Sequence, residues 1–240
     1  MEILCCPEAI LGGLARESDG QSPADVALGV ESGELASVVA PLCGSPVAVI
    51  VGFTERDPEG RLFGSAGFLA GGGVAAIRRK SYPGYRTVIR GGGELRTLDH
   101  GSTPIGIVIC NDLWYPEPVR VLAAEGAAIV FVPMNSGHPR EVTPSFRARG
   151  ENLPVARAVD ATTTVVVADI AGSEAGRIAH GFSAIVDPDG VVVGRVAPME
   201  TGLVIADVEA TRRPFDPRGW DGTTNPDVSE QFRALDARIR

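Results

Sequence analysis

Short apolar runs, each long enough for one strand, alternate along the chain with amphipathic stretches. Runs of four to eight apolar residues bounded by Gly, Pro or Asp favour strands, and longer stretches with polar faces favour helices. Strands are predicted over residues 1–6, 47–54, 63–69, 74–80, 95–99, 104–110, 128–132, 163–169, 184–186, 191–196 and 202–207. A helix, either regular throughout or with a loose start, is predicted over residues 24–39, and further helices are predicted over residues 117–126, 145–160 and 228–239.

The connections between these elements are of two kinds. The segments Ala70-Gly71-Gly72-Gly73 and Asp187-Pro188-Asp189-Gly190 have the residue types of tight hairpin turns. The predicted helices 117–126 and 145–160 instead separate strands, as in β-α-β crossovers. Hairpins combined with crossovers favour a mixed-sheet α/β sandwich over a purely parallel doubly wound sheet. Because no repeat or linker interrupts the pattern, we expect residues 1–240 to form one domain.

The composition agrees with a folded chain and excludes several functions. Although 30 Gly and 18 Pro in 240 residues are typical of loop-rich chains, 44% hydrophobic residues are enough for a core. The formal charge is −8, and no basic run is longer than Arg78-Arg79-Lys80. Binding to nucleic acid is therefore not expected, because it depends on neutralising phosphates. No membrane association is expected, since no apolar run approaches the ~18 residues of a membrane span.

The beginning of the sequence and its cysteines indicate a cellular compartment. The first apolar stretch has no basic residues before it and is interrupted by Pro7 and Glu8, unlike a signal peptide. The four cysteines form no CxxC pair, and the three histidines are not spaced as metal ligands. We therefore expect a cytoplasmic protein with reduced thiols, no metal and no cofactor.

Cys110 is the most informative candidate for chemistry. It ends an apolar strand, and a helix is predicted to begin a few residues later. Ligands bind at such strand ends in open α/β sheets, where backbone N–H groups are free to contact a developing anion. A cysteine there can act as a nucleophile if a neighbouring group lowers its pKa or accepts its proton. The alternative is a buried core cysteine, because a free cysteine packs as a small hydrophobe.

Two charged residues at other strand ends favour the nucleophilic interpretation of Cys110 over that of a core cysteine. Glu8 follows the first predicted strand, and Lys80 ends the strand 74–80. Taken singly, each is expected to be an exposed surface charge. Together with Cys110 they form an ordered pattern: Pro-Glu, then Arg-Lys, then strand-Cys-x-Asp-x-x-x-Pro-Glu.

This order closely resembles the nitrilase, or carbon–nitrogen hydrolase, superfamily. Six segments match landmarks of that family in the family's order: residues 4–13, 51–56, 79–80, 106–117, 156–160 and 183–190. The resemblance implies a four-layer α-β-β-α sandwich with mixed sheets. It also implies a homodimer or higher homo-oligomer joined through helical faces, with residues 208–240 packing on a partner subunit. Family members usually have an opening strand and helix before the Pro-Glu strand, so a shortened or lost first layer is expected here.

The catalytic triad that the resemblance implies is Glu8, Lys80 and Cys110. Cys110 would attack the substrate and form a thioester. Glu8 would accept the thiol proton, return it to the leaving ammonia and then activate water. Lys80 and the backbone N–H of Asn111 would stabilise the tetrahedral oxyanion.

The substrate implied is a small amide or an N-carbamoyl compound. Nitrile hydrolysers of this family carry Trp-Glu after the cysteine, whereas Asn111-Asp112 resembles the amidase and carbamoylase branches. The possible substrate pocket consists of Glu94, Trp114, Asn135 and His138. The alternatives are a nitrile hydrolase and a catalytically impaired relative that acts as a binding or assembly module.

Overall fold

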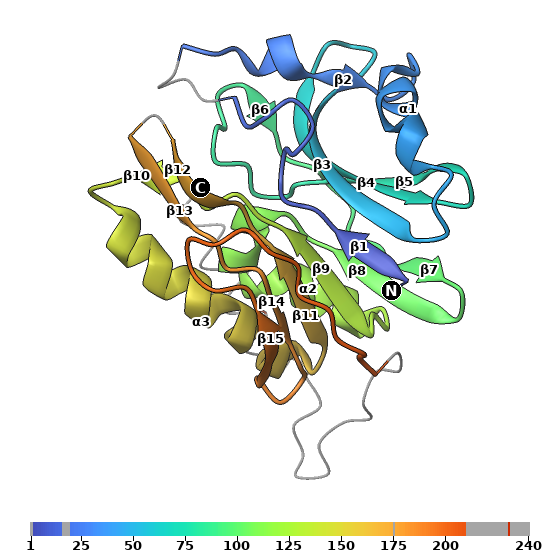
Figure 1. The fold of residues 1–240 in the computed structure, drawn as a ribbon. Helices are drawn as coiled ribbons and strands as arrows, with labels where there is room; N and C mark the ends of the chain where they lie inside the picture. Colours follow the sequence, from blue (N-terminus) through green and yellow to red (C-terminus); the bar gives the residue numbers. More distant parts are fainter. Residues whose placement is uncertain (1, 16–19, 175, 210–229, 231–240) are drawn as a thin grey trace.

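The strands in about the first third of the chain form one sheet. The computed structural model describes residues 2–15, 20–174, 176–209 and 230 (Figure 1). In this sheet the strands follow the order β1-β3-β4-β5, with β2 beside β3 and β6 beside β4. Their bounds are β1 Ile3–Cys5, β2 Leu28–Gly29, β3 Ala48–Arg56, β4 Leu62–Ala70, β5 Gly73–Arg79 and β6 Ile89–Arg90. β1 pairs parallel to β3, while β3, β4 and β5 form antiparallel hairpins.

The second sheet follows the order β15-β14-β11-β9-β8-β7. Its bounds are β7 Leu98–His100, β8 Thr103–Ile107, β9 Ile129–Pro133, β11 Thr164–Ala168, β14 Ala184–Val186 and β15 Val192–Arg195. The three central strands β8, β9 and β11 are parallel, and the outer pairs are antiparallel. The carboxyl ends of the parallel strands therefore meet at one edge. Both sheets mix pairings, as the sequence predicts.

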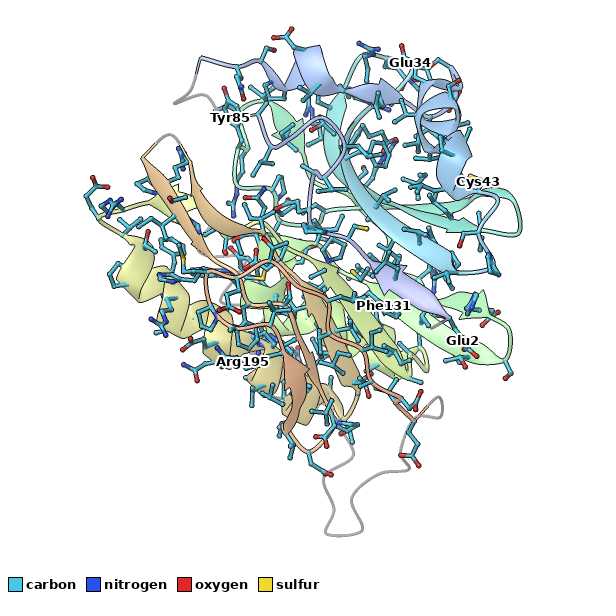
Figure 2. All side chains as sticks on the ribbon, in the orientation of Figure 1. Glu2, Glu34, Cys43, Tyr85, Phe131 and Arg195 are labelled. Atoms are coloured by element: carbon cyan, nitrogen blue, oxygen red, sulfur yellow. The ribbon has the colours of Figure 1, made fainter. Side chains whose placement is uncertain are left out.

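Three hydrophobic clusters show that the layers number four. Between the sheets, Ile50 and Phe68 of the first pack with Ile107 and Phe131 of the second, and Figure 2 shows Phe131 in this inner layer. The outer face of the first sheet packs against α1 (Glu34–Val39). The outer face of the second packs against α2 (Pro116–Ala124) and α3 (Thr143–Ala161). The predicted α-β-β-α sandwich is confirmed.

The predicted helix 24–39 is wrong in most of its length. The segment contains a 3₁₀ turn at Pro23–Val26, then β2, and only its end is the helix α1. Gly33 stands immediately before α1 with φ 80°, a left-handed conformation that a continuous helix cannot contain. Glu34 also accepts a hydrogen bond from the Gly29 backbone N–H at 2.7 Å, which stabilises the bend.

The predicted strand 202–207 is also wrong. These residues pair with no strand among the described residues. They lie along a hollow of about 840 Å³ that β1 and the inner face of β11 also line. Leu203 and Ile205 are 61% and 63% exposed, so apolar residue types alone do not make a strand where no partner edge is present.

Three further findings complete the fold. A small third sheet has the order β10-β13-β12. Its strands are β10 His138–Pro139, β12 Ala171–Glu174 and β13 Arg177–His180, and no element is predicted from sequence in these segments. The predicted helix 228–239 falls outside the described residues except for residue 230. Among the described residues, no helix has the length and apolar character needed to cross a bilayer.

Candidate active site

Glu8 lies just beyond the end of β1, where its backbone packs closely against the backbone of β3. A Cβ atom at position 52 would lie 2.7 Å from Glu8 Cα and 2.5 Å from the Ala9 nitrogen, so only glycine fits in β3 there. The Glu8 N–H donates to the Met134 carbonyl at 3.1 Å, which ties it to the end of β9 in the other sheet. The side chain is 6% exposed. The glutamate is therefore buried where the two sheets meet.

Lys80 follows β5 and points to the same place. Its backbone N–H donates to Gly64 and its carbonyl accepts from Gly92, both at 2.7 Å, so the backbone on each side of the residue is fixed. Lys80 Nζ lies 2.6 Å from Glu8 Oε1, and both side chains are buried. The structure thus brings the side chains of Glu8 and Lys80 together.

Cys110 begins a sharp turn from strand to helix. It is the first residue of a 3₁₀ helix, Cys110–Trp114, a few residues beyond β8, and α2 follows directly. Its φ is +46°, which is unfavourable for a residue with a Cβ and occurs mostly where the surroundings enforce it. The Sγ lies 3.9 Å from the Asn135 carbonyl at the end of β9.

The three side chains determine one another's protonation. Burial and the Glu8 carboxylate raise the pKa of Cys110 to about 12, while the Lys80 cation acts in the opposite direction. Burial alone would lower the pKa of Lys80, but the negative charges of the Cys110 thiolate, Glu8 and Asp112 outweigh it, so the pKa is raised. Burial and Glu8 thus favour the thiol form of Cys110, and the negative charges around Lys80 favour its cation.

The second oxygen of Glu8 is the unusual feature of the site. Oε1 accepts from Lys80, whereas the buried Oε2 has no hydrogen-bond partner among the described residues. A buried carboxylate oxygen without a donor is costly, and proteins keep few of them. It is an acceptor available for a proton.

Arg157 supports the turn that presents Cys110. It belongs to the landmark 156–160, extends from α3 and is 7% exposed. Its guanidinium donates to the carbonyls of Leu113 and Trp114, at 3.0 and 3.2 Å, and pairs with Asp160 at 3.0 Å. These contacts satisfy the carbonyls at the end of the 3₁₀ helix. The sequence located the segment but not this role.

Asp169 is a site residue that the sequence analysis did not single out. It follows β11 and accepts from the Ser136 N–H and hydroxyl, at 2.9 and 2.6 Å, and from the Phe182 N–H. Burial raises the pKa of this carboxyl. Because Ser136 follows Asn135, the network fixes the carbonyl that faces the Cys110 thiol. The available signal was an acidic residue directly after an apolar strand.

The remaining predicted site residues divide into two groups. Asn111 follows Cys110 in the turn, and Asn135 contacts the Cys110 thiol through its backbone. Trp114 and His138 both pack on Phe146, with ring centroids 5.4 and 3.7 Å away, beside a small pocket that His138 and Phe146 line.

Glu94 requires a correction. The structure places this side chain at the surface, 70% exposed and paired with Arg96 at 2.6 Å, in a depression that Arg79 also lines. Glu94 does not lie with the triad, because its segment runs away from Lys80 along the outer side of the first sheet. Within the described ranges, no three His, Cys, Asp or Glu side chains are grouped in a way that could hold a metal ion.

Comparisons with known proteins identify the family of the chain. The carbon–nitrogen hydrolase family model matches residues 1–215. An (R)-stereoselective amidase of Pseudomonas sp. is 28% identical over 222 residues, which cover 90% of this chain and 77% of the amidase. A glutamine-dependent NAD(+) synthetase of Xanthomonas campestris is 24% identical over 76% of this chain, and the match spans only 34% of the synthetase.

A solved structure shares the fold. An amidase from Nesterenkonia sp. AN1, a glutamate-to-glutamine variant that carries acrylamide on its active-site cysteine, superposes with a TM-score of 0.71. The superposition covers 96% of this chain and 86% of that one, at 22% identity. At this identity the likeness supports the fold alone.

Proposed function

Because the chain belongs to the carbon–nitrogen hydrolase family, we propose that it hydrolyses a non-peptide C–N bond of a small amide or N-carbamoyl compound through a thioester on Cys110. The observation that carries the proposal is the Glu8 carboxylate. One of its oxygens is held by Lys80 at 2.6 Å, and the other is buried with no hydrogen-bond partner among the residues described; the carboxylate raises the pKa of the nearby Cys110 thiol.

The raised pKa of Cys110 requires a general base. Because burial and the Glu8 carboxylate raise the pKa of Cys110, the thiol form is favoured near pH 7, and attack on a substrate then needs a group that accepts the thiol proton. Glu8 Oε2 accepts the proton while Sγ bonds to the substrate carbonyl carbon. As the proton leaves the thiol, the positive charge of Lys80 offsets the negative charge that develops.

The remaining steps use the same groups. The carbonyl oxygen becomes an oxyanion, which Lys80 Nζ and the Asn111 N–H stabilise. When the tetrahedral intermediate collapses, the C–N bond breaks and the leaving nitrogen takes the proton from Glu8. Glu8 then accepts a proton from a water molecule that attacks the thioester, and that proton returns to Cys110 as the acid is released.

The relatives favour amides as substrates. The curated relatives include the (R)-stereoselective amidase and an N-carbamoylputrescine amidase of Solanum tuberosum, 24% identical over 79% of this chain. The side-chain amide of glutamine belongs in the same test, because glutamine-dependent synthetases match part of their length to this chain. The homo-oligomer and the cytoplasmic location remain predictions, and light scattering of the purified chain tests the first.

The decisive experiment measures ammonia and hydroxamate. The purified protein is incubated with aliphatic and aromatic amides, N-carbamoyl amines, glutamine and a nitrile, with and without hydroxylamine. We expect ammonia from an amide or carbamoyl compound, and hydroxamate when hydroxylamine intercepts the thioester of an amide substrate. Cys110→Ala should abolish both products. Cys43→Ala is the matched control, because Cys43 is also a partly buried free cysteine, and its thiol donates to the Val39 carbonyl beside α1.

Two outcomes contradict the proposal. Turnover that survives Cys110→Ala overturns the thioester route. No turnover on the whole panel by a folded protein favours the alternative of a binding or assembly module.

A further inference from the structure

The Asp112 carboxylate joins two chain segments that carry two different triad residues. It is 1% exposed. Oδ2 accepts from the Ile109 N–H at 3.0 Å, just before Cys110, and Oδ1 accepts from the Tyr82 N–H at 2.7 Å, two residues after Lys80. One buried side chain thus holds the end of β8 and the segment that follows β5.

Two other contacts bring the same segments together. The Asn111 side-chain amide donates to the Tyr82 carbonyl at 2.8 Å. The rings of Tyr82 and Tyr115 stack, with centroids 3.8 Å apart and 12° between their planes. Tyr82 is therefore held through its N–H, its carbonyl and its ring, and the lysine-bearing segment is fixed against the cysteine turn.

We propose that Asp112 is a positioning residue that fixes Lys80 relative to Cys110. This inference rests on the proposed function, because it assigns to Asp112 the geometry in which Lys80 stabilises charge on the sulfur and on the oxyanion. The carboxylate itself does not contact the reacting atoms. It acts through the two backbone segments that it connects.

The geometry requires a carboxylate and not an amide. Two N–H donors approach Asp112 from two segments, and an ionised carboxylate offers an acceptor to each. Asparagine at this position has one carbonyl oxygen and would turn its NH₂ toward one of the two donors. That donor would be buried without a partner, so the tie between the segments would break on one side.

The first arm of the test is a double-mutant cycle. Asp112→Asn should lower kcat about 10- to 100-fold, since a misplacement of about 1 Å costs up to about 10²-fold, and leave KM within about threefold. In a Lys80→Met background the further loss from Asp112→Asn should shrink to less than about threefold, because the residue being positioned is gone. Asp57→Asn is the matched control: Asp57 also accepts two backbone N–H groups, from Glu59 and Arg61, but in the β3–β4 turn.

The second arm needs no substrate. Alkylation of Cys110 by iodoacetamide, measured by peptide mass spectrometry from pH 7 to 10, reports how well Lys80 stabilises the thiolate. Asp112→Asn should slow the alkylation of Cys110 severalfold at every pH when Lys80 is present. In the Lys80→Met protein it should leave the alkylation rate unchanged. This arm still tests Asp112 if no amide is turned over, which would itself overturn the proposed function.

Three results overturn the inference. One is a loss of kcat from Asp112→Asn that is as large in the Lys80→Met background as in the protein with Lys80. Another is an equal loss from Asp57→Asn. The third is wild-type alkylation and turnover in a folded Asp112→Asn protein, with folding checked by its melting temperature.

Discussion

Two ion pairs lie next to each other at the end of β5 and differ in how fully their carboxylate oxygens are hydrogen-bonded. Arg79 pairs with Glu55, and the next residue, Lys80, pairs with Glu8. Successive residues of an extended chain point to opposite sides, so the two pairs lie on different faces of the first sheet. Glu55 is fully satisfied: Arg79 donates to both carboxylate oxygens and the Ser65 hydroxyl donates at 2.6 Å. Glu8 accepts from Lys80 through Oε1, and its Oε2 has no hydrogen-bond partner in the part of the chain that the structure describes.

The difference separates a structural pair from a reactive one. Arg79 also stacks over Phe63, with its guanidinium carbon 3.8 Å from the ring centroid, so its pair is both packed and saturated. A carboxylate whose oxygens are all hydrogen-bonded can only be weakened by losing a partner. An unsaturated carboxylate oxygen costs stability, and the fold retains it beside a thiol and a lysine cation.

The largest effect is expected at the two glutamates. Glu8→Gln should lower kcat by about 10²- to 10⁴-fold, because it removes the general base. Glu55→Gln should leave kcat within about threefold but lower the free energy of unfolding by roughly 1–3 kcal/mol, because it weakens the hydrogen bonds of a buried carboxylate whose arginine partner is partly exposed. Steady-state kinetics and urea denaturation of both variants measure the contrast. Similar losses of activity in both variants would refute it.

A second contrast compares the adjacent cations. Lys80→Met should lower kcat by about 10²- to 10³-fold, the usual cost of losing an oxyanion donor. Arg79→Met should mainly lower the melting temperature, since its carboxylate partner becomes unpaired. Single-turnover rates and thermal melts distinguish the two, and a lysine variant with normal rates would assign the oxyanion to other donors.

The pH dependence of Cys110 gives an intermediate effect. Because its pKa is raised to about 12, its alkylation by iodoacetamide should rise about tenfold per pH unit between pH 7 and 10, with no plateau. Glu8→Gln removes a negative charge that raises this pKa, so the profile should shift to lower pH. A plateau near pH 8 in the wild type would show that the resting site holds a thiolate.

The smallest effect is expected at Glu94. Glu94→Gln removes an exposed ion pair with Arg96, which contributes at most about 1 kcal/mol. Turnover should stay within twofold and the melting temperature within about 2 °C. A tenfold loss of activity would return Glu94 to the pocket in which the sequence analysis placed it.

The sequence predicted the sandwich because apolar runs and turn residues are local signals. It predicted that Glu8 and Lys80 meet because each ends a strand and matches a family motif. It missed Asp169 and the supporting role of Arg157, whose partners lie 33 and 44 positions away in sequence at Ser136 and Leu113. It misplaced Glu94 because a loop acid carries no signal for the side of the sheet it will face. The strand prediction for residues 202–207 was wrong for a related reason, because a strand forms only where the edge of a sheet is available for pairing.

The left-handed backbone of Cys110 also bears on how such a site could be lost in evolution. Its positive φ costs every residue except glycine about 1 kcal/mol or more, and cysteine is kept there at that cost. In a lineage released from selection for hydrolysis, glycine at this position would relieve the strain of the positive φ. Among relatives with this fold, glycine at the tip of this turn would therefore mark chains that have exchanged catalysis for another use of the scaffold.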